Sequence, residues 1–240
     1  MEIKVVKLYD NGSFAEDFLF GGENKADGNH DVTYPASLQN FLIDTGSEII
    51  LVDTGLSPET PFKGYDKVND YIPALKALGY EPEQVSKILV THKHPDHTGE
   101  LKSFPNAKIY IGPEDADALK LTGENIIRCE YTDGAYHNFE HCQKIADGVY
   151  FIKARGHTKG NSIIIAEKDG VYYMMHGDVT YNDTALKRNK LSIVFEDLEA
   201  ARDTLNRVRE FIKNNPTIYL STHTPEGYKN LEDKVIMKLD

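Results

Sequence analysis

Residues 91–99 read Thr91-His92-Lys93-His94-Pro95-Asp96-His97-Thr98-Gly99 and directly follow the apolar run Ile88-Leu89-Val90. Imidazole and carboxylate groups are ligands that borderline cations such as zinc prefer, and a chain leaving a buried strand can aim them into one cleft. His92 and His94 are two residues apart and can face one cation. Asp96 and His97 lie beyond the bend at Pro95 and can face a second cation a few ångströms away. The stretch therefore predicts a metal site, and Gly99 lets the backbone pass close to it.

Length and composition limit the class of protein. The chain has 240 residues, enough to bury a substantial core, and we expect a single domain over residues 1–240. Charged residues make up 27% and hydrophobic residues 40%, which is typical of a globular protein. The formal net charge of -11 repels phosphate backbones and anionic lipid. We therefore expect neither nucleic acid nor a membrane as a partner.

The N-terminus and the cysteines indicate a compartment. Residues 1–7 alternate polar and apolar side chains like a first strand and lack the apolar core of a signal peptide. No apolar stretch has the length needed to span a bilayer. Cys129 and Cys142 are the only cysteines, and we interpret both as packed thiols. A reducing cytoplasm is the expected location.

Hydrophobic periodicity predicts two groups of strands, each with helices outside it. Strands are expected at 1–7, 41–43, 49–52, 87–91, 108–111, 149–152, 162–166, 171–175 and 217–220, with a turn at Asp169-Gly170. Helices are expected at 68–78, from about 97, after Pro113, at about 197–214 with Leu198, Ala201, Leu205, Val208 and Ile212 on one face, and at the C-terminal end. This pattern favours an α/β fold in which two sheets pack face to face between helical layers, an αββα sandwich.

Further candidate ligands stand where later strands end. His157 follows the strand at 149–152, Asp178 follows the strand at 171–175, and His223 follows the strand at 217–220. Loops at one end of a sandwich can converge although they are far apart in sequence. His157, Asp178 and His223 therefore join the first cluster as candidates.

Other polar residues have competing interpretations. His176 alternates with Asp178 along a strand end and should point elsewhere. His30, His137 and His141 lie in polar segments, where solvent-facing or substrate-side roles are commoner than metal binding. Asp53 follows a buried strand, where it could either orient a metal-bound imidazole or cap a turn. The Asp-Thr-Gly triplets at 44–46 and 53–55 flank one hairpin, so they do not form the two-lobed dyad of an aspartic protease.

These motifs together resemble the metallo-β-lactamase superfamily. The resemblance runs from about residue 40 to 225 and includes the segments 53–55 and 156–160. It implies that His92, His94 and His157 hold one metal ion, that Asp96, His97 and His223 hold the other, and that Asp178 bridges them. Zinc is the favoured metal, and iron, manganese or cobalt accept the same ligands.

Departures from several subfamilies narrow the choice. The residue Asp178 argues against true β-lactamases, which lack the bridging carboxylate, and His94 is not the glutamate of flavodiiron proteins. The processing ribonucleases of this superfamily also fit poorly, because they would carry RNA-binding elements. The N-acyl homoserine lactonases and the glyoxalase II-like thioesterases remain. The ligand spacing and Tyr181, three residues after Asp178, resemble the lactonases, whose tyrosine contacts the substrate carbonyl, although a chain with 14 tyrosines can place one there by chance.

The implied reaction is hydrolysis of a lactone or related ester. Two cations sharing a bridging water lower its pKa from about 16 to about 7 and so supply a hydroxide nucleophile. Tyr181 would stabilise the developing oxyanion, and Asp96 or Asp178 would carry a proton to the leaving alkoxide. A thioesterase or a phosphodiesterase on the same site, or a non-catalytic metal-binding partner protein, are the alternatives.

The substrate pocket should be shaped by residues 10–40 and 122–145. Both segments are largely polar, although Phe14, Phe18, Leu19 and Phe20 could form an apolar lid. Exposed lid residues could also be covered in a homodimer.

Overall fold

The computed structural model describes residues 1–239, whose strands form a seven-stranded and a five-stranded sheet. The larger sheet has the order β4-β1-β2-β3-β5-β6-β7, with β1 Glu2–Ala15, β2 Thr33–Asp44, β3 Ile49–Val52, β4 Asp66–Lys67, β5 Val85–Leu89, β6 Lys108–Ile111 and β7 Ile126–Arg128. The smaller sheet has the order β12-β11-β10-β9-β8, with β8 Cys142–Ala146, β9 Val149–Lys153, β10 Ser162–Lys168, β11 Val171–Met175 and β12 Thr217–Leu220.

The two sheets pack face to face through one apolar layer. Phe41 and Val52 of the larger sheet share this layer with Phe151, Ile164 and Met175 of the smaller one, and all five side chains are buried. Alternate residues of a strand point to opposite faces, so the same strands also present side chains outward to the helices. The inner layer therefore holds the sandwich together.

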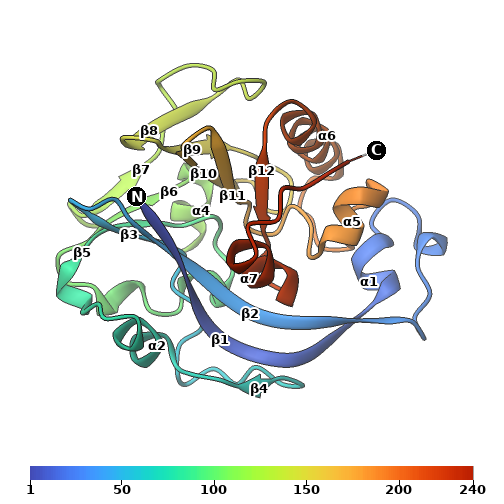
Figure 1. Ribbon diagram of the computed structural model, residues 1–240, viewed down its shortest axis with the longest axis horizontal. Helices are drawn as coiled ribbons and strands as arrows, with labels where there is room; N and C mark the ends of the chain where they lie inside the picture. Colours follow the sequence, from blue (N-terminus) through green and yellow to red (C-terminus); the bar gives the residue numbers. More distant parts are fainter. Residues whose placement is uncertain (240) are drawn as a thin grey trace.

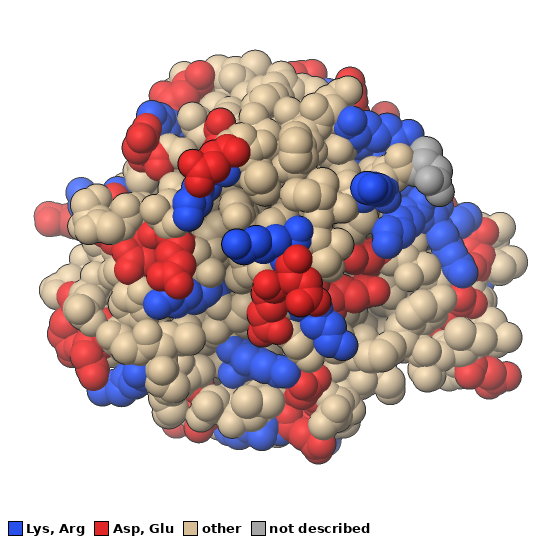
Figure 2. Space-filling view, viewed as in Figure 1, with Lys and Arg blue, Asp and Glu red and all other residues tan. Residues whose placement is uncertain are grey.

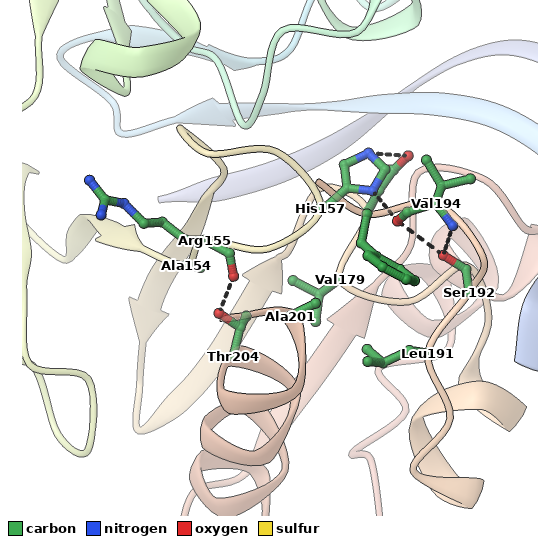
Figure 3. Close-up of a pocket in the computed structure, with 11 residues that line it drawn as sticks. Ala154, Arg155, His157, Val179, Leu191, Ser192, Val194, Ala201 and Thr204 are labelled. Carbon is green, nitrogen blue, oxygen red and sulfur yellow. Dashed lines mark hydrogen bonds and ion pairs between the residues drawn. The ribbon is translucent and has the colours of Figure 1, made fainter. Parts of the chain in front are cut away.

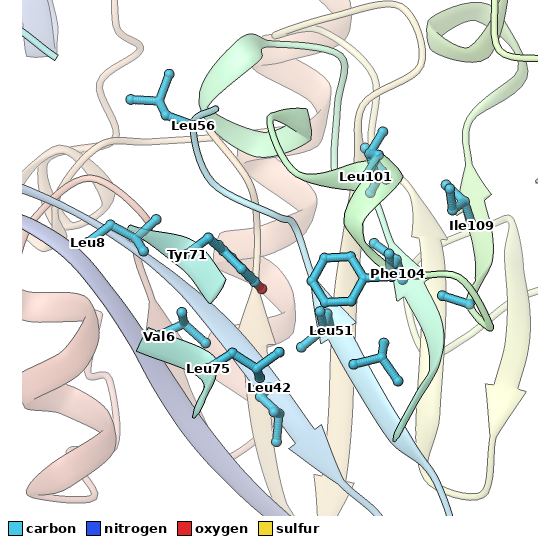
Figure 4. Packing of buried hydrophobic residues seen from close by; sticks show 14 of the residues in the cluster. Val6, Leu8, Leu42, Leu51, Leu56, Tyr71, Leu75, Leu101, Phe104 and Ile109 are labelled. Carbon is cyan, nitrogen blue, oxygen red and sulfur yellow. The ribbon is translucent and has the colours of Figure 1, made fainter. Parts of the chain in front are cut away.

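The helices of the described residues are α1 Glu16–Phe20, α2 Tyr71–Ala77, α3 Pro95–Thr98, α4 Pro113–Ala118, α5 Asp183–Arg188, α6 Leu198–Asn214 and α7 Pro225–Glu232, with short 3₁₀ turns at Lys25–Asp27, Pro82–Gln84 and Leu101–Ser103. In Figure 1, α2 and α6 lie on opposite sides of the two sheets. On the larger sheet, Tyr71 and Leu75 of α2 pack on Leu42 and Leu51 (Figure 4). On the smaller sheet, α6 packs on the cluster that contains Ile163. The predicted four-layer αββα sandwich is confirmed.

The sequence explains where α6 begins and which face it buries. The Asp197 side chain accepts a hydrogen bond from the Ala200 amide, an N-cap that satisfies one of the first backbone donors. Leu205 and Val208 are fully buried against the smaller sheet, as the periodicity predicts. Leu198 was predicted on the same face but is 39% exposed, because it is the first residue of the helix and precedes the packed turns.

The N-terminal strands are longer than predicted. β1 and β2 pair from Glu2 opposite Asp44 to Ala15 opposite Thr33, so within the polar segment 10–40 only residues 16–32 lie outside these strands. Polar residues in β2 obscured this strand in the sequence. One of them, Gln39, is buried and donates to the carbonyl oxygens of Ser221 and Thr224, so its polarity is satisfied inside the fold.

The local structure tests three further predictions. The helix expected at 68–78 begins only at Tyr71, because Lys67 pairs with Tyr9 as part of β4, and Val68 is 46% exposed. The turn at Asp169-Gly170 is confirmed, since Lys168 pairs with Val171 and both turn residues have positive φ. The segment 122–145, for which only a polar character was predicted, contains β7 and the start of β8.

The surface carries both signs of charge. On the face shown in Figure 2, lysine and arginine side chains are interspersed with aspartate and glutamate. Within residues 1–239, no helix is both long and apolar enough to cross a membrane.

Candidate metal centre

The metal loop leaves β5 and turns into the short helix α3. Pro95 occupies the first position of this helix, where its missing N–H costs nothing, and Asp96 and His97 follow within it. Gly99 then donates its amide to the Gly55 carbonyl at 2.7 Å, and a Cβ at this position would lie 2.1 Å from the backbone nitrogen of Ser57. The predicted close passage of the backbone at Gly99 is therefore confirmed.

Three histidines converge on one point. The Nε2 of His157 lies 3.2 Å from the Nε2 of His92 and 3.0 Å from the Nδ1 of His94, and those two nitrogens are 3.1 Å apart. His92 and His157 are buried, and His94 is partly exposed. Together with Asp178, these residues offer four ligand atoms that all lie within 4.8 Å of one another.

A second group of ligand atoms, from Asp96, His97 and His223, also lies near the Asp178 carboxylate. The Nε2 of His223 lies 3.3 Å from Oδ2 of Asp96 and 3.1 Å from Oδ2 of Asp178. The Nε2 of His97 lies 3.8 Å from Asp96 and 3.4 Å from the other Asp178 oxygen. Asp178 also lies 3.5 Å from His157 of the first group, so its carboxylate faces both groups.

The outer ring nitrogens of His97 and His92 are held by neighbouring groups. Nδ1 of His97 lies 2.7 Å from the Asp53 carboxylate, which also accepts from the Thr91 amide at 2.7 Å and the Thr91 hydroxyl at 2.8 Å. Nδ1 of His92 lies 3.0 Å from that hydroxyl. Such contacts fix the ring orientation and leave the opposite nitrogen free for a metal ion. Of the two interpretations of Asp53, the geometry favours the one in which it orients an imidazole.

Asp53 adopts a backbone conformation that L-residues rarely use. Its φ of 63° lies in the left-handed region, where Asn and Asp are the most tolerated residues after glycine. The conformation costs about 1–2 kcal/mol for a residue with a Cβ. It turns the carboxylate from the end of β3 toward Thr91 and His97, so the strain is coupled to the site.

His157 is oriented from another direction. Its Nδ1 lies 3.1 Å from the Val194 carbonyl oxygen, on the loop that precedes α6 (Figure 3). Behind the ring lies a small pocket lined mainly by apolar side chains, among them Val179, Leu191 and Ala201. Burial in these surroundings lowers the pKa of His157 to about 4, although the nearby Asp178 charge opposes the change. The ring is therefore neutral at pH 7, which is the form that binds a cation.

The carboxylates and imidazoles of the second group shift each other's pKa values. Burial disfavours the Asp178 carboxylate, but His223 and His97 outweigh it and hold the pKa of Asp178 well below its usual value. Burial likewise disfavours charged His97, but Asp53 and Asp178 raise the pKa of His97 well above its usual value. Asp178 is consequently ionised at neutral pH, as a carboxylate ligand must be.

Several buried donors and acceptors of this cluster remain free. Among residues 1–239, Nε2 of His97, Nε2 of His223 and Oδ1 of Asp178 have no hydrogen-bond partner. Buried polar atoms are normally paired, so such atoms call for another partner. Imidazole and carboxylate atoms gathered in two groups are ligands of the kind that divalent cations bind. The structure thus brings together all seven residues predicted as ligands.

The other predicted histidines lie elsewhere. His176 is buried and stacks on the Tyr219 ring, with the ring centroids 3.9 Å apart, so it points away from the cluster as expected. His30, His137 and His141 are exposed. Both cysteines are buried free thiols, in agreement with their interpretation as packed side chains.

Tyr181 lies beside the second group under aromatic cover. Its ring is stacked on His223 with centroids 5.1 Å apart, and Phe14 and Phe18 meet it edge-on at 5.4 and 5.1 Å. Burial, followed by the charges of Asp178 and Asp96, raises the pKa of Tyr181 well above its usual value. The phenol is therefore protonated at neutral pH and able to donate a hydrogen bond.

The predicted lid is only half correct. Phe14 and Phe18 do cover Tyr181, and they stack on each other at 4.9 Å. Leu19 and Phe20 belong to the same apolar cluster as Tyr181, but they are fully buried and so form part of its core and not an exposed lid.

Comparison with known proteins places the chain in a family. The model of the metallo-beta-lactamase superfamily matches residues 39–223. The chain belongs to this superfamily. The predicted resemblance is thereby confirmed, and the two groups of ligand atoms occupy one edge of the metallo-β-lactamase sandwich.

Some relatives within the superfamily have names that state a particular activity. An N-acyl homoserine lactonase from a Bacillus species is 27% identical over 198 residues, covering 75% of this chain and 78% of that protein. A solved N-acyl homoserine lactone hydrolase, with N-hexanoyl-L-homoserine bound at its catalytic metal center, has a TM-score of 0.69 at 20% identity and covers 95% of this chain and 94% of its own. A dizinc quorum-quenching lactonase has a TM-score of 0.68 at 17% identity, covering 93% and 88%. The two structures support the fold.

Proposed function

We propose that the protein is a metal-dependent hydrolase that opens a lactone of the N-acyl homoserine class. The observation that carries the proposal is the position of Asp178, whose carboxylate faces His157 at 3.5 Å and His223 at 3.1 Å, between two groups of ligand atoms. Two divalent cations, with zinc favoured, fit these groups. When bound, they would lower the pKa of a shared water to give a hydroxide and would polarise the substrate carbonyl.

The protein groups have separate tasks around the cations. His92, His94 and His157 would bind one cation through nitrogens that already converge within 3.0–3.2 Å. Asp96, His97 and His223 would bind the other. Because their outer ring nitrogens are held by Thr91, Asp53 and Val194, His92, His97 and His157 are preorganised for binding.

Tyr181 would act on the substrate carbonyl. Its buried, protonated phenol lies close to Asp178 and can donate a hydrogen bond to the oxygen as negative charge develops there. A preorganised donor of this kind stabilises the transition state by about 3 kcal/mol. When the ring C–O bond breaks, Asp178 or Asp96 would pass a proton to the leaving alkoxide, which yields the ring-opened hydroxy acid.

Three observations support the choice of a lactone as substrate. Tyr181 stands at the position where the lactonases carry a substrate-contacting tyrosine, and the similar Bacillus protein is named an N-acyl homoserine lactonase. Phe14 and Phe18 add an apolar wall beside Tyr181, which suits a substrate with an acyl chain better than a charged phosphodiester.

A substrate panel tests the proposal. Zinc-loaded protein is assayed with an N-acyl homoserine lactone, a glutathione thioester and an activated phosphodiester, and kcat/KM is compared. We expect the lactone to be preferred by at least about tenfold. Preference for the thioester or phosphodiester would overturn the substrate class, and two bound metals without any turnover would favour the non-catalytic alternative.

A further inference from the structure

A buried carboxylate outside the ligand set connects the two loops that carry the first group of histidines. Asp115 belongs to α4 and is fully buried. Its Oδ2 accepts hydrogen bonds from the Lys93 amide at 3.0 Å and the Thr158 hydroxyl at 2.6 Å. Its Oδ1 accepts from the Gly160 amide at 3.1 Å. A single side chain therefore contacts both loops.

The contacts of Asp115 adjoin the predicted ligands. Lys93 stands between His92 and His94, and Thr158 directly follows His157. Because hydrogen bonds to a charged acceptor are stronger and shorter than neutral ones, they restrain the two loop backbones firmly. The position of His157 relative to His92 and His94 thus depends on a residue that touches none of the three.

The backbone around Asp115 is shaped for this contact. A Cβ on Gly160 would lie 2.7 Å from the Asp115 side chain, and a Cβ on Gly112 would lie 2.2 Å from the Gly160 carbonyl oxygen. Only glycine lets α4 and the His157 loop approach so closely. The two glycines and the carboxylate therefore form one close contact between α4 and the loop.

A second link between the loops is weaker because it is more exposed. Lys93 Nζ contacts Glu196, which also accepts from the Lys159 amide at 2.9 Å. The Glu196 side chain is 33% exposed, so water and salt screen this pair. The Asp115 side chain is shielded from solvent and has three donors, so it is the stronger restraint.

We propose that Asp115 is a positioning residue of the metal centre, whose carboxylate sets the spacing of the loops at 91–94 and 156–160 so that three histidines face one cation. The inference rests on the metal binding of the proposed function. It predicts that loss of the carboxylate weakens one metal site selectively. In Asp115→Asn an amide nitrogen replaces one acceptor and faces an N–H or O–H donor, so at least one contact is lost.

Zinc release tests this role without reference to hydrolysis. Zinc-loaded protein is mixed with excess 4-(2-pyridylazo)resorcinol, and the absorbance of the zinc complex gives the release rate of each ion. We expect Asp115→Asn to release one zinc about tenfold faster than wild type and the other at the wild-type rate. Asp117→Asn is the matched control, since Asp117 lies on the same helix with its side chain 71% exposed.

A milder pair of variants decides the result if Asp115→Asn does not fold. Thr158→Val removes one hydroxyl donor, and Thr158→Ser restores it. We expect faster release of one zinc from the valine variant and wild-type release from the serine variant. Equal rates in wild type and Thr158→Val, or acceleration of both ions in parallel with a lower melting temperature of the zinc-free protein, would overturn the proposal.

The same measurement separates the two proposals. Wild-type protein that fails to hold two zinc ions would contradict the proposed function and with it the role of Asp115. Wild-type protein that holds two ions, with variants that release both at the wild-type rate, would contradict only the role of Asp115.

Discussion

Asp183 provides a quantitative test of the electrostatics next to the site. It is the first residue of α5, two residues after Tyr181, and only 7% of it is exposed. Its Oδ2 accepts a hydrogen bond from Asn230 at 3.0 Å, while within residues 1–239 its Oδ1 has no partner. Burial, followed by the charge of Glu226, raises the pKa of Asp183 to about 6 from an ordinary value of 3.8.

The sign of the pH dependence follows from this shift. Below pH 3.8 the carboxyl is protonated in both the folded and the unfolded chain, so burial carries no charge penalty. As the pH rises from 3.8 through 6, the unfolded chain ionises first and the folded state loses stability relative to it. The difference between a pKa of 3.8 and one of about 6 corresponds to about 3 kcal/mol of folding stability, which is fully lost above pH 6.

Asp183→Asn removes the titrating group and keeps an acceptor for Asn230. We expect it to stabilise the protein by up to about 3 kcal/mol at pH 7.5, or about 6–12 °C in melting temperature, and by almost nothing at pH 4. Thermal unfolding of both proteins at equal metal loading, from pH 4 to 8, measures the difference. Asp147→Asn is the control, because Asp147 is fully exposed. An Asn variant no more stable than wild type at pH 7.5, or equally stabilised at pH 4, would refute the reasoning.

Three further variants test the site itself. Tyr181→Phe should keep both metals and lower kcat on a lactone by about 100-fold, since one oxyanion donor is lost; unchanged turnover would remove Tyr181 from the reaction. Asp53→Asn tolerates the left-handed backbone but disturbs the contact to His97 at 2.7 Å, so chelator competition should show metal affinity reduced about 10- to 100-fold, and wild-type affinity would speak against the orienting role. Gly99→Ala puts a Cβ 2.1 Å from the Ser57 backbone nitrogen, which should cost at least about 2 kcal/mol in urea unfolding; a neutral effect would show that this loop can shift.

The candidate ligands could be predicted because strand ends are visible in sequence. His157, Asp178 and His223 each follow an apolar run of strand length, and the structure brings them to one edge of the sandwich. Imidazole and carboxylate side chains carry their chemistry wherever the chain places them. Local pattern and residue type therefore identified these residues as candidates, and the resemblance to the superfamily implied how they divide into two groups.

The roles of residues that depend on burial could not be predicted from the sequence. Asp115 stands among three acidic residues of one short helix, Glu114, Asp115 and Asp117, and only packing shows that Asp115 alone is fully buried between the histidine loops. Likewise, Gln39 makes β2 look like a polar segment until its partners, the carbonyl oxygens after β12, are known. Val68 shows the reverse case, because its apolar side chain fits a helical pattern yet lies exposed before α2. Tertiary contacts decided each of these positions.

Anomalous diffraction at the zinc absorption edge, from crystals of the zinc-loaded protein, would show directly whether Asp178 lies between two metal ions. We predict two anomalous peaks per chain, one among His92, His94 and His157 and the other among Asp96, His97 and His223, with Asp178 adjacent to both. A single peak, or zinc bound away from Asp178, would contradict a site in which this carboxylate serves two cations.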